Sequence, residues 1–175
     1  MGGGTKSRRY EKTEEAILTV FFDNPNCTMW QLAKKTGIAR STIYTHHRSI
    51  ERIMPDCENN ILAEYDFMLG KKLEIENIEL RKLFFYMLVF IVRNRQTFEL
   101  FLKFGNREVV IKMILKLKPK IREPEKILRI CAGEITEIVF EWGERGFLEN
   151  EIERVLGDVM YLTKTARERL APINP

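Results

Sequence analysis

The sequence has too few cysteines for a disulfide-stabilised protein. Its 175 residues include Cys27, Cys57 and Cys131, an odd number at wide spacing. This pattern argues against a disulfide framework and favours a reducing compartment. No apolar run follows the first basic residues, so we do not expect a secretory signal. We therefore expect a cytoplasmic protein.

Long hydrophobic runs are also missing. The longest uncharged apolar run, LFFYMLVFIV at residues 83–92, is too short to span a bilayer. Lys and Arg flank it on both sides, and we interpret it as a fully buried core helix. We therefore expect no membrane among the partners.

Motifs for catalysis and for metal or nucleotide binding are absent as well. No glycine-rich phosphate loop follows a strand-like segment, and there is no G-x-S-x-G motif. The adjacent His46 and His47 would point about 100° apart on a helix, so they cannot chelate one ion as an i,i+4 pair would. Carboxylates are numerous, but 31% of the residues are charged and solvated helix faces explain them. We expect no enzyme, no metal and no cofactor.

Helical periodicity is present along almost the whole chain. Strand-like alternation bounded by hairpin turns does not occur, whereas apolar residues recur at helical spacing between breaks at Asn, Gly and Pro. Pro55 predicts a kink or a restart, and Asn150 with Glu153 predicts a capping box. The sequence predicts an all-α protein with helices ending near 23 and covering about 28–35, 39–46, 49–69, 76–94, 97–104, 107–118, 124–145 and 150–170.

Positive charge is concentrated in the first third of the chain. The net charge is +4, and residues 1–52 hold nine of the 29 Lys and Arg but only five of the 25 Asp and Glu. The rest of the chain holds 20 of each and is neutral. This asymmetry favours a polyanion-binding N-terminal domain, residues 1–52, joined to a larger neutral domain, residues 53–175.

Residues 28–48 have the layout of a helix-turn-helix. Ala33 is small where two short helices would cross, and Gly37 lies where a tight turn favours positive φ. Leu32, Ile38 and Ile43 would lock the second helix onto the first. The second helix is otherwise polar, as expected of a helix that enters the major groove and reads base edges.

A helical corner without any role in DNA binding is the alternative. The position of the glycine, the charge asymmetry and the lack of acidic residues between Asp23 and Glu51 favour a DNA reader over that corner.

The stretch LAKKTGIARSTIYTHH, followed by a capped helix, resembles the TetR-type family of bacterial transcriptional regulators. The matching positions are Leu32-Ala33, Thr36-Gly37-Ile38, Thr42-Ile43-Tyr44 and His46. The motif match covers about residues 10–54. Two positions depart from the family pattern: His47 replaces a phenylalanine, and Ile50 replaces a lysine that contacts phosphate, for which Arg48 or Arg52 would have to substitute.

The resemblance implies double-stranded DNA with a palindromic operator as the partner. It implies that Arg40, Ser41, Thr42 and Thr45 face the groove. Tyr44 and His46 would contact phosphates, and Thr28 would do so through the start of its helix. A basic arm formed by Lys6, Arg8 and Arg9 would add sequence-independent affinity. His47 is expected to pack beneath the recognition helix as an aromatic replacement.

The C-terminal domain is rich in aromatic residues and Met, which is typical of an ordinary helix-bundle core. The resemblance implies an effector domain instead, with a pocket for a small apolar or amphipathic molecule. Candidate pocket residues are Tyr65, Tyr86, Phe90, Arg93, Asn94 and Trp142.

The last two helices carry broad apolar faces, which we interpret as a homodimer interface in a four-helix bundle. A two-fold dimer would match a palindromic operator. The expected interface residues are Ile135, Ile138, Trp142, Ile152, Val155 and Val159.

These expectations combine into a repressor whose ligand shifts the spacing of two DNA-reading domains. One alternative is a DNA-binding regulator or architectural protein without an effector, whose C-terminal domain only dimerises or binds a protein partner. Another is a helical enzyme or interaction module.

Overall fold

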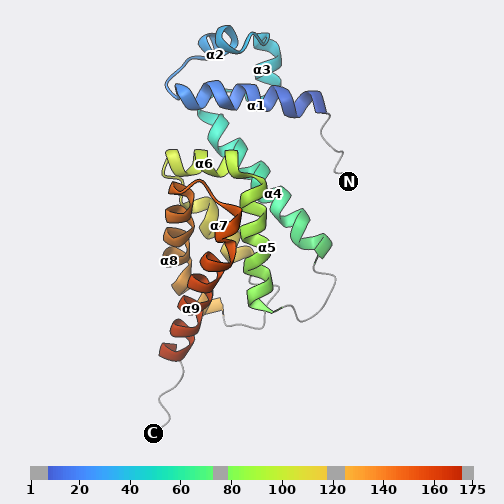
Figure 1. Ribbon diagram of the computed structural model, residues 1–175. Helices are drawn as coiled ribbons and strands as arrows, with labels where there is room; N and C mark the ends of the chain where they lie inside the picture. Colours follow the sequence, from blue (N-terminus) through green and yellow to red (C-terminus); the bar gives the residue numbers. More distant parts are fainter. Residues whose placement is uncertain (1–7, 73–78, 118–124, 171–175) are drawn as a thin grey trace. The chain divides into compact units, whose positions relative to one another are not determined.

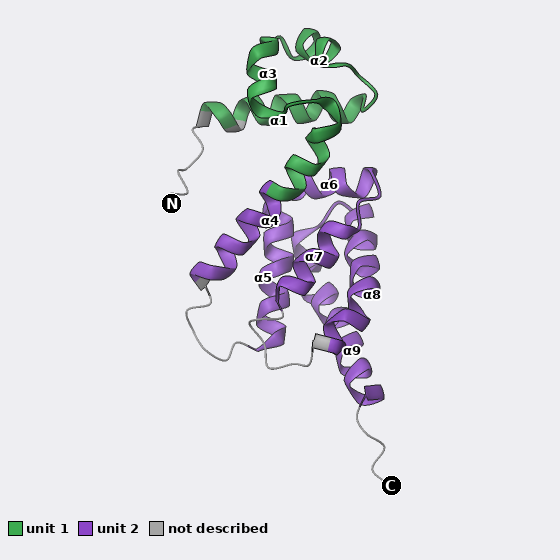
Figure 2. Cartoon of the chain, turned by 180° about the vertical axis from the view of Figure 1, so that it is seen from behind, with its two compact units in different colours: residues 1–59 green, residues 60–175 purple. Residues whose placement is uncertain are grey.

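The computed structural model describes residues 8–72, 79–117 and 125–170, and over these residues the chain is helical, with no strand. The all-α class is therefore confirmed. The chain divides into two compact units, residues 1–59 and 60–175, which we call the head and the body (Figure 2). The division lies later than the expected boundary at 52/53, because the head includes the first part of the helix that begins at Ile53.

The head consists of α1 (Arg8–Asp23), α2 (Met29–Thr36), α3 (Arg40–His46), the 3-10 turn η1 (Ile50–Arg52) and the start of α4 (Ile53–Lys72) (Figure 1). Helix α2 packs against both α1 and α3. The core of the head includes the fully buried Ile17, Leu32, Ile43 and Ile53. The apolar residues expected to hold the two short helices together therefore do face inward at Leu32 and Ile43.

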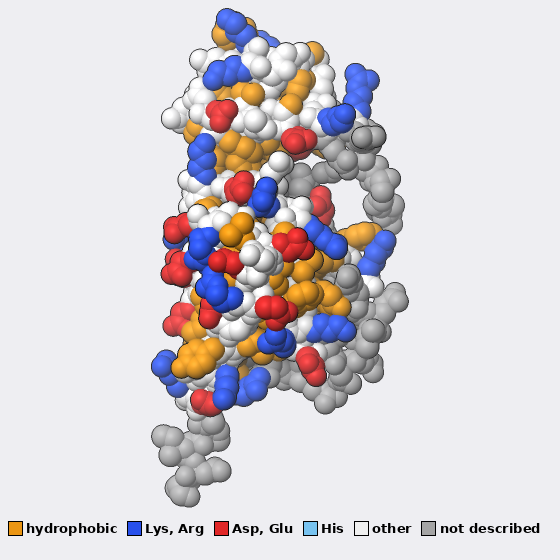
Figure 3. Space-filling view, viewed as in Figure 1, with side chains coloured by type: hydrophobic (Ala, Val, Ile, Leu, Met, Phe, Trp, Pro, Cys, Tyr) orange, Lys and Arg blue, Asp and Glu red, His pale blue; other side chains and the backbone are white. Residues whose placement is uncertain are grey.

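The body contains the rest of α4 together with α5 (Leu80–Arg93), α6 (Arg95–Lys103), α7 (Glu108–Lys116), α8 (Glu125–Glu144), η3 (Glu149–Glu151) and α9 (Ile152–Leu170). Helix α8 packs along α9, and α9 packs against α5 (Figures 1 and 2). Helix α8 also contacts α7 and α6. On the face of the body drawn in Figure 3, Lys and Arg alternate with Asp and Glu, so neither sign of charge dominates that face.

Aromatic rings fill much of the core of the body. Trp142 lies edge-on to Phe147 with ring centroids 5.3 Å apart, and Phe147 lies 6.2 Å from Phe98. Phe98 in turn contacts Phe90 at 6.4 Å, and Phe90 contacts Tyr65 at 5.2 Å. Edge-on and tilted contacts are the arrangement that aromatic quadrupoles favour. The row of rings takes its members from α4, α5, α6 and α8 and from the turn after α8, and it therefore joins these four helices.

Some helix limits differ from the sequence prediction. The expected capping box of Asn150 and Glu153 does not form, because residues 149–151 make a 3-10 turn and α9 begins at Ile152. Gly70 lies inside α4 and does not end it. The restart near Pro55 is confirmed: α4 begins at Ile53, which puts Pro55 in the first turn, where a missing N–H costs nothing.

The apolar run at residues 83–92 lies in α5 and is buried on one side only. Seven residues of α5 are buried, whereas Phe85, Tyr86 and Val89 are half-exposed. The prediction of a fully buried helix is therefore too strong. No helix among the described residues combines the length and apolar character needed to cross a membrane.

Candidate functional site

The start of α2 is closed by a capping box. The Thr28 hydroxyl accepts a hydrogen bond from the backbone N–H of Gln31 at 3.2 Å, and the Gln31 side chain accepts one from the N–H of Thr28 at 2.8 Å. Such reciprocal bonds satisfy two donors that a helix start leaves free. The helix expected from about residue 28 therefore has Thr28 as its N-cap.

The turn between α2 and α3 depends on Gly37. This residue ends α2 in the left-handed region at φ 69°, which glycine adopts without strain. The hydroxyl of Thr36 donates to the carbonyl of Leu32 at 2.8 Å and accepts from the N–H of Ile38 at 3.2 Å. The positive φ expected at this turn from the sequence is therefore present at Gly37.

Helix α3 buries one side chain and exposes most of the others. Ile43 is fully buried. The exposed side chains are Arg40, Ser41, Thr42, Tyr44 and Thr45. Tyr44 is 43% exposed, and the Arg40 guanidinium lies 5.9 Å from the centre of its ring. Five of the six side chains of α3 expected at a DNA surface are thus accessible.

An exposed aromatic residue on α2 was missed by the sequence analysis. Trp30 is 55% exposed, and the Lys34 ammonium lies 5.2 Å from the centre of a Trp30 ring. The i,i+4 spacing of Trp30 and Lys34 is a signal that the sequence does carry. The head therefore presents two outward pairs of an aromatic ring and a cation, one on α2 and one on α3.

The expected contact of His46 with phosphate is wrong for its side chain, which is only 4% exposed. Its Nδ1 lies 2.5 Å from Glu14 Oε2, and its ring stacks on Tyr10 with centroids 4.0 Å apart. The His46 ring, which the resemblance assigned to a DNA phosphate, therefore contacts side chains of α1 instead.

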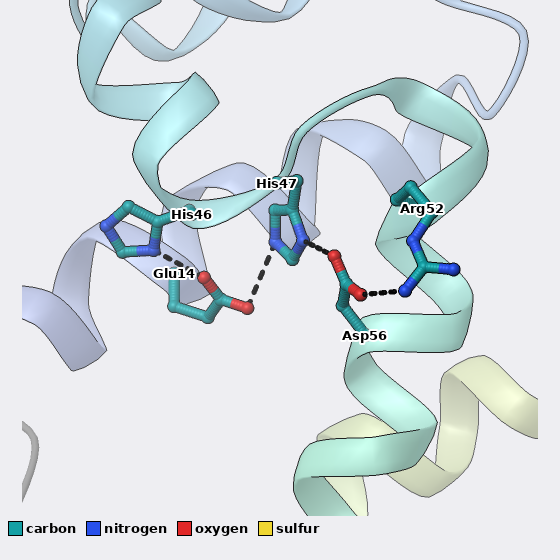
Figure 4. A network of polar contacts seen from close by, with 5 residues as sticks. All are labelled: Glu14, His46, His47, Arg52 and Asp56. Atoms are coloured by element: carbon teal, nitrogen blue, oxygen red, sulfur yellow. Dashed lines mark hydrogen bonds and ion pairs between the residues drawn. The ribbon is translucent and has the colours of Figure 1, made fainter.

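His47 is buried beneath α3, as expected, but its surroundings are ionic. With its side chain 1% exposed, its Nε2 lies 3.1 Å from Glu14 Oε1 and its Nδ1 lies 3.2 Å from Asp56 Oδ2. The contact of Nε2 is an ion-pair contact and not a well-directed hydrogen bond. Arg52 donates to the other oxygen of Asp56 at 3.2 Å (Figure 4). We call Glu14, His46, His47, Arg52 and Asp56 the histidine cluster.

The contacts within the histidine cluster shift the pKa values of Glu14 and His47. Burial pushes the pKa of Glu14 up, but the contacts with His47 and His46 outweigh burial and lower the pKa below its usual 4.5. Burial pushes the pKa of His47 down, but Glu14 and then Asp56 outweigh burial and raise the pKa above 6.5. The charged forms of both groups are therefore favoured in the folded head.

The expected basic arm is described only in part. Lys6 lies outside the described residues, and Arg8 is the first residue of α1. Arg9 lines an open depression of about 600 Å³ together with Lys12, Thr13, Ala16, Thr36 and Ile38. Of the two candidates for the missing lysine, Arg52 pairs with Asp56, while Arg48 is exposed.

The six candidate pocket residues occupy different environments. The rings of Tyr65 and Phe90 are buried in mutual contact. Trp142 is linked to that pair through Phe147 and Phe98, and it donates its Nε1–H to Leu148 O at 3.1 Å. The remaining three lie elsewhere: Arg93 is exposed, Tyr86 is half-exposed, and Asn94 donates to Phe90 O.

The hydroxyl of Tyr65 has no hydrogen-bond partner among the described residues. Burial, and to a lesser degree the charge of Asp66, raises the pKa of Tyr65.

The expected dimer interface is wrong in most of its residues. Ile135, Trp142, Val155 and Val159 are fully buried and Ile152 is 6% exposed within a single chain. These side chains form the core of the body and are not available to a second copy. Only Ile138 is half-exposed. The exposed apolar side chains of the two helices are instead Ile130 at 50% and Tyr161 at 72%.

Within the described ranges, no group of three or more His, Cys, Asp and Glu side chains is arranged to hold a metal ion. Comparisons with protein-family models, curated proteins and solved structures give no significant match. The function must therefore be argued from the residues themselves.

Proposed function

We propose that the head binds double-stranded DNA through a helix-turn-helix formed by α2 and α3, and that the chain is a TetR-like transcriptional regulator. The observation that carries the proposal is the division of side chains on α3. One apolar residue, Ile43, anchors the helix, while five polar or aromatic side chains stay exposed. A short helix held in this way can enter the major groove and present hydrogen-bonding groups to base edges.

The charge of residues 1–52 supports the same partner. The excess positive charge of the sequence lies in residues 1–52, and cations accompany both exposed aromatic rings of the head, Trp30 and Tyr44. A phosphate backbone is the polyanion that such a surface fits, while aromatic rings add apolar contact to sugars and bases.

Two copies would read a palindromic site. In this proposal the copies meet through the outer surfaces of α8 and α9, where Ile130 and Tyr161 are exposed. Gly133 and Gly157 on the same helices have open space where a side chain would be, and so leave room for a close helix approach.

In the leading proposal, the protein is a repressor, and a small apolar or amphipathic ligand that binds the body releases it from its operator. One observation favours the alternative without an effector: Tyr65, Phe90 and Trp142 already lie in packed ring contacts. A ligand panel separates the two, because only the first predicts that a small molecule releases bound DNA.

The DNA proposal is tested by selecting duplexes from a random pool with the full-length protein. We expect enrichment of a two-fold symmetric sequence and affinity that falls steeply with salt, because each neutralised phosphate releases counterions. If no sequence is enriched and no duplex binds even at low salt, the proposal fails.

A further inference from the structure

The two carboxylates around His47 require a doubly protonated ring. Glu14 approaches Nε2 from α1 and Asp56 approaches Nδ1 from α4 (Figure 4). A neutral imidazole has one N–H, so it would turn a lone pair toward one of the two carboxylates. The side chain is 1% exposed, which leaves little room for water to separate the repelling groups.

An imidazolium at His47 would balance the charges that the two carboxylates and Arg52 bring to the cluster. Glu14 and Asp56 bring two negative charges, and Arg52 brings one positive charge from a side chain that is 55% exposed. From α3, His46 contacts the second oxygen of Glu14, and from α1 the ring of Tyr10 stacks on His46. A neutral His47 would leave a buried negative charge without compensation, which is costly in a low-dielectric interior.

His47 also terminates α3. Its backbone N–H donates to the carbonyl of Ile43 at 2.8 Å, while its ring contacts α1 and α4. The protonated ring therefore ties the end of α3 to two other helices of the head. Phenylalanine, which the TetR-type pattern has at this position, would fill the space but could not make these charged contacts.

We propose that His47 is a proton-dependent latch that fixes α3 in the head, and that DNA affinity falls when His47 loses its proton as the pH rises. The second half of this proposal rests on the proposed function. The proposed partner is still double-stranded DNA, and the latch would make its binding to α2 and α3 depend on pH.

The pH window follows from the directions of the two shifts. The pKa of His47 is raised above 6.5, so its contribution to stability is complete below pH 6.5 and is lost as the pH rises through the folded-state pKa. The pKa of Glu14 is lowered below 4.5, so its contribution is complete above pH 4.5 and is lost as the pH falls through the folded-state value. Both contributions are therefore complete between pH 4.5 and pH 6.5, where the latch is closed. The latch opens as the pH rises through the folded-state pKa of His47.

Imidazole resonances give a direct test in the full-length protein. The chain has only two histidines, so comparison with a His47→Phe variant assigns both. We expect His47 to titrate above 6.5 and to titrate at lower pH in Asp56→Asn, which keeps the ring but removes one negative partner. Titration of His47 at or below 6.5 overturns the latch.

DNA affinity is then measured with a selected duplex from about pH 6 to about pH 9 at constant ionic strength. For the wild type we expect affinity to fall by up to about tenfold per pH unit above the folded-state pKa of His47. His47→Phe keeps His46 and every other titrating group, so it should lose this part of the slope. In Asp56→Asn, which serves if His47→Phe does not fold, the fall should begin at lower pH. Equal slopes in all three proteins overturn the regulation while leaving DNA binding intact.

If the wild type binds no duplex at any pH, the proposed function fails, and the DNA half of this proposal fails with it. Amide-exchange protection of α3 then decides the latch alone. Protection that drops with rising pH in the wild type but not in His47→Phe supports it, and equal protection in both overturns it.

Discussion

At the scale of single residues, the head uses aromatic side chains in two opposite ways. His46 and His47 point inward to carboxylates of α1 and α4, whereas Trp30 and Tyr44 point outward beside Lys34 and Arg40. Neighbouring positions on a helix face different directions, so a short segment can both anchor α3 and expose a binding surface. The adjacent histidines therefore serve the fold of the head, and the exposed side chains of α3 are other residues.

Arg40 and Tyr44 should each contribute directly to DNA affinity. We expect Arg40→Ala and Tyr44→Ala each to weaken binding by about 1–3 kcal/mol, or about 5- to 150-fold, because both side chains are exposed and their removal leaves the core intact. Fluorescence anisotropy with a selected duplex measures the change, and circular dichroism checks that helicity is retained. Arg95→Ala, which removes an exposed cation from α6 in the body, is the control and should bind as the wild type does. Wild-type affinity in both head variants would refute the assignment of α3.

At the scale of elements, the C-terminal end of α8 is held by a close approach between Gly143 and Phe147. A Cβ on Gly143 would lie 2.6 Å from the Phe147 ring. The ring cannot move away easily, because it is 2% exposed and packs against Trp142 and Phe98. Phe147 also has a positive φ of 47°, an uncommon conformation for a non-glycine residue. The turn between α8 and α9 therefore depends on glycine at position 143.

Gly143→Ala should destabilise the body by about 1–3 kcal/mol through overpacking. Gly70→Ala in α4 is the control: a Cβ there meets nothing within 4 Å, so the change should stabilise α4 by up to about 1 kcal/mol. Trp142 reports on this region once Trp30, the other tryptophan, is replaced by phenylalanine. Urea denaturation followed by Trp142 fluorescence gives both values. Equal midpoints for the two alanine variants would contradict the predicted clash.

At the scale of the whole molecule, the excess positive charge lies in residues 1–52, and the body keeps most of its large apolar side chains inside. Trp142, Tyr65 and Phe84 are all fully buried. Two exposed apolar side chains, Ile130 and Tyr161, remain on α8 and α9. In the proposed dimer, a second copy would bury them, which would remove apolar area from water and bring two heads to a two-fold symmetric DNA site.

The proposed dimer should depend on Tyr161. We expect a dimeric mass for the wild type at micromolar concentration and a monomeric mass for Tyr161→Glu, because a buried carboxylate without a partner opposes association. Phe67→Glu provides the control, since Phe67 is also a highly exposed aromatic residue of the body, at 62%, but lies on α4. Multi-angle light scattering distinguishes the masses. A monomeric wild type, or loss of the dimer in the control variant alone, would show that the interface is assigned wrongly.

The sequence by itself determined the helical class, most helix limits, the basic N-terminal region and the glycine turn at residue 37. These features depend on local periodicity, on residues that stop helices, and on backbone conformations that only some residues adopt. Only the tertiary structure decided which partner each side chain meets. It turned Ile135, Val155 and Val159 into core, and it brought Glu14 across from α1 to His46 and His47. Periodicity shows that a face is apolar or polar, but the element that covers that face is set by packing between residues far apart in the chain.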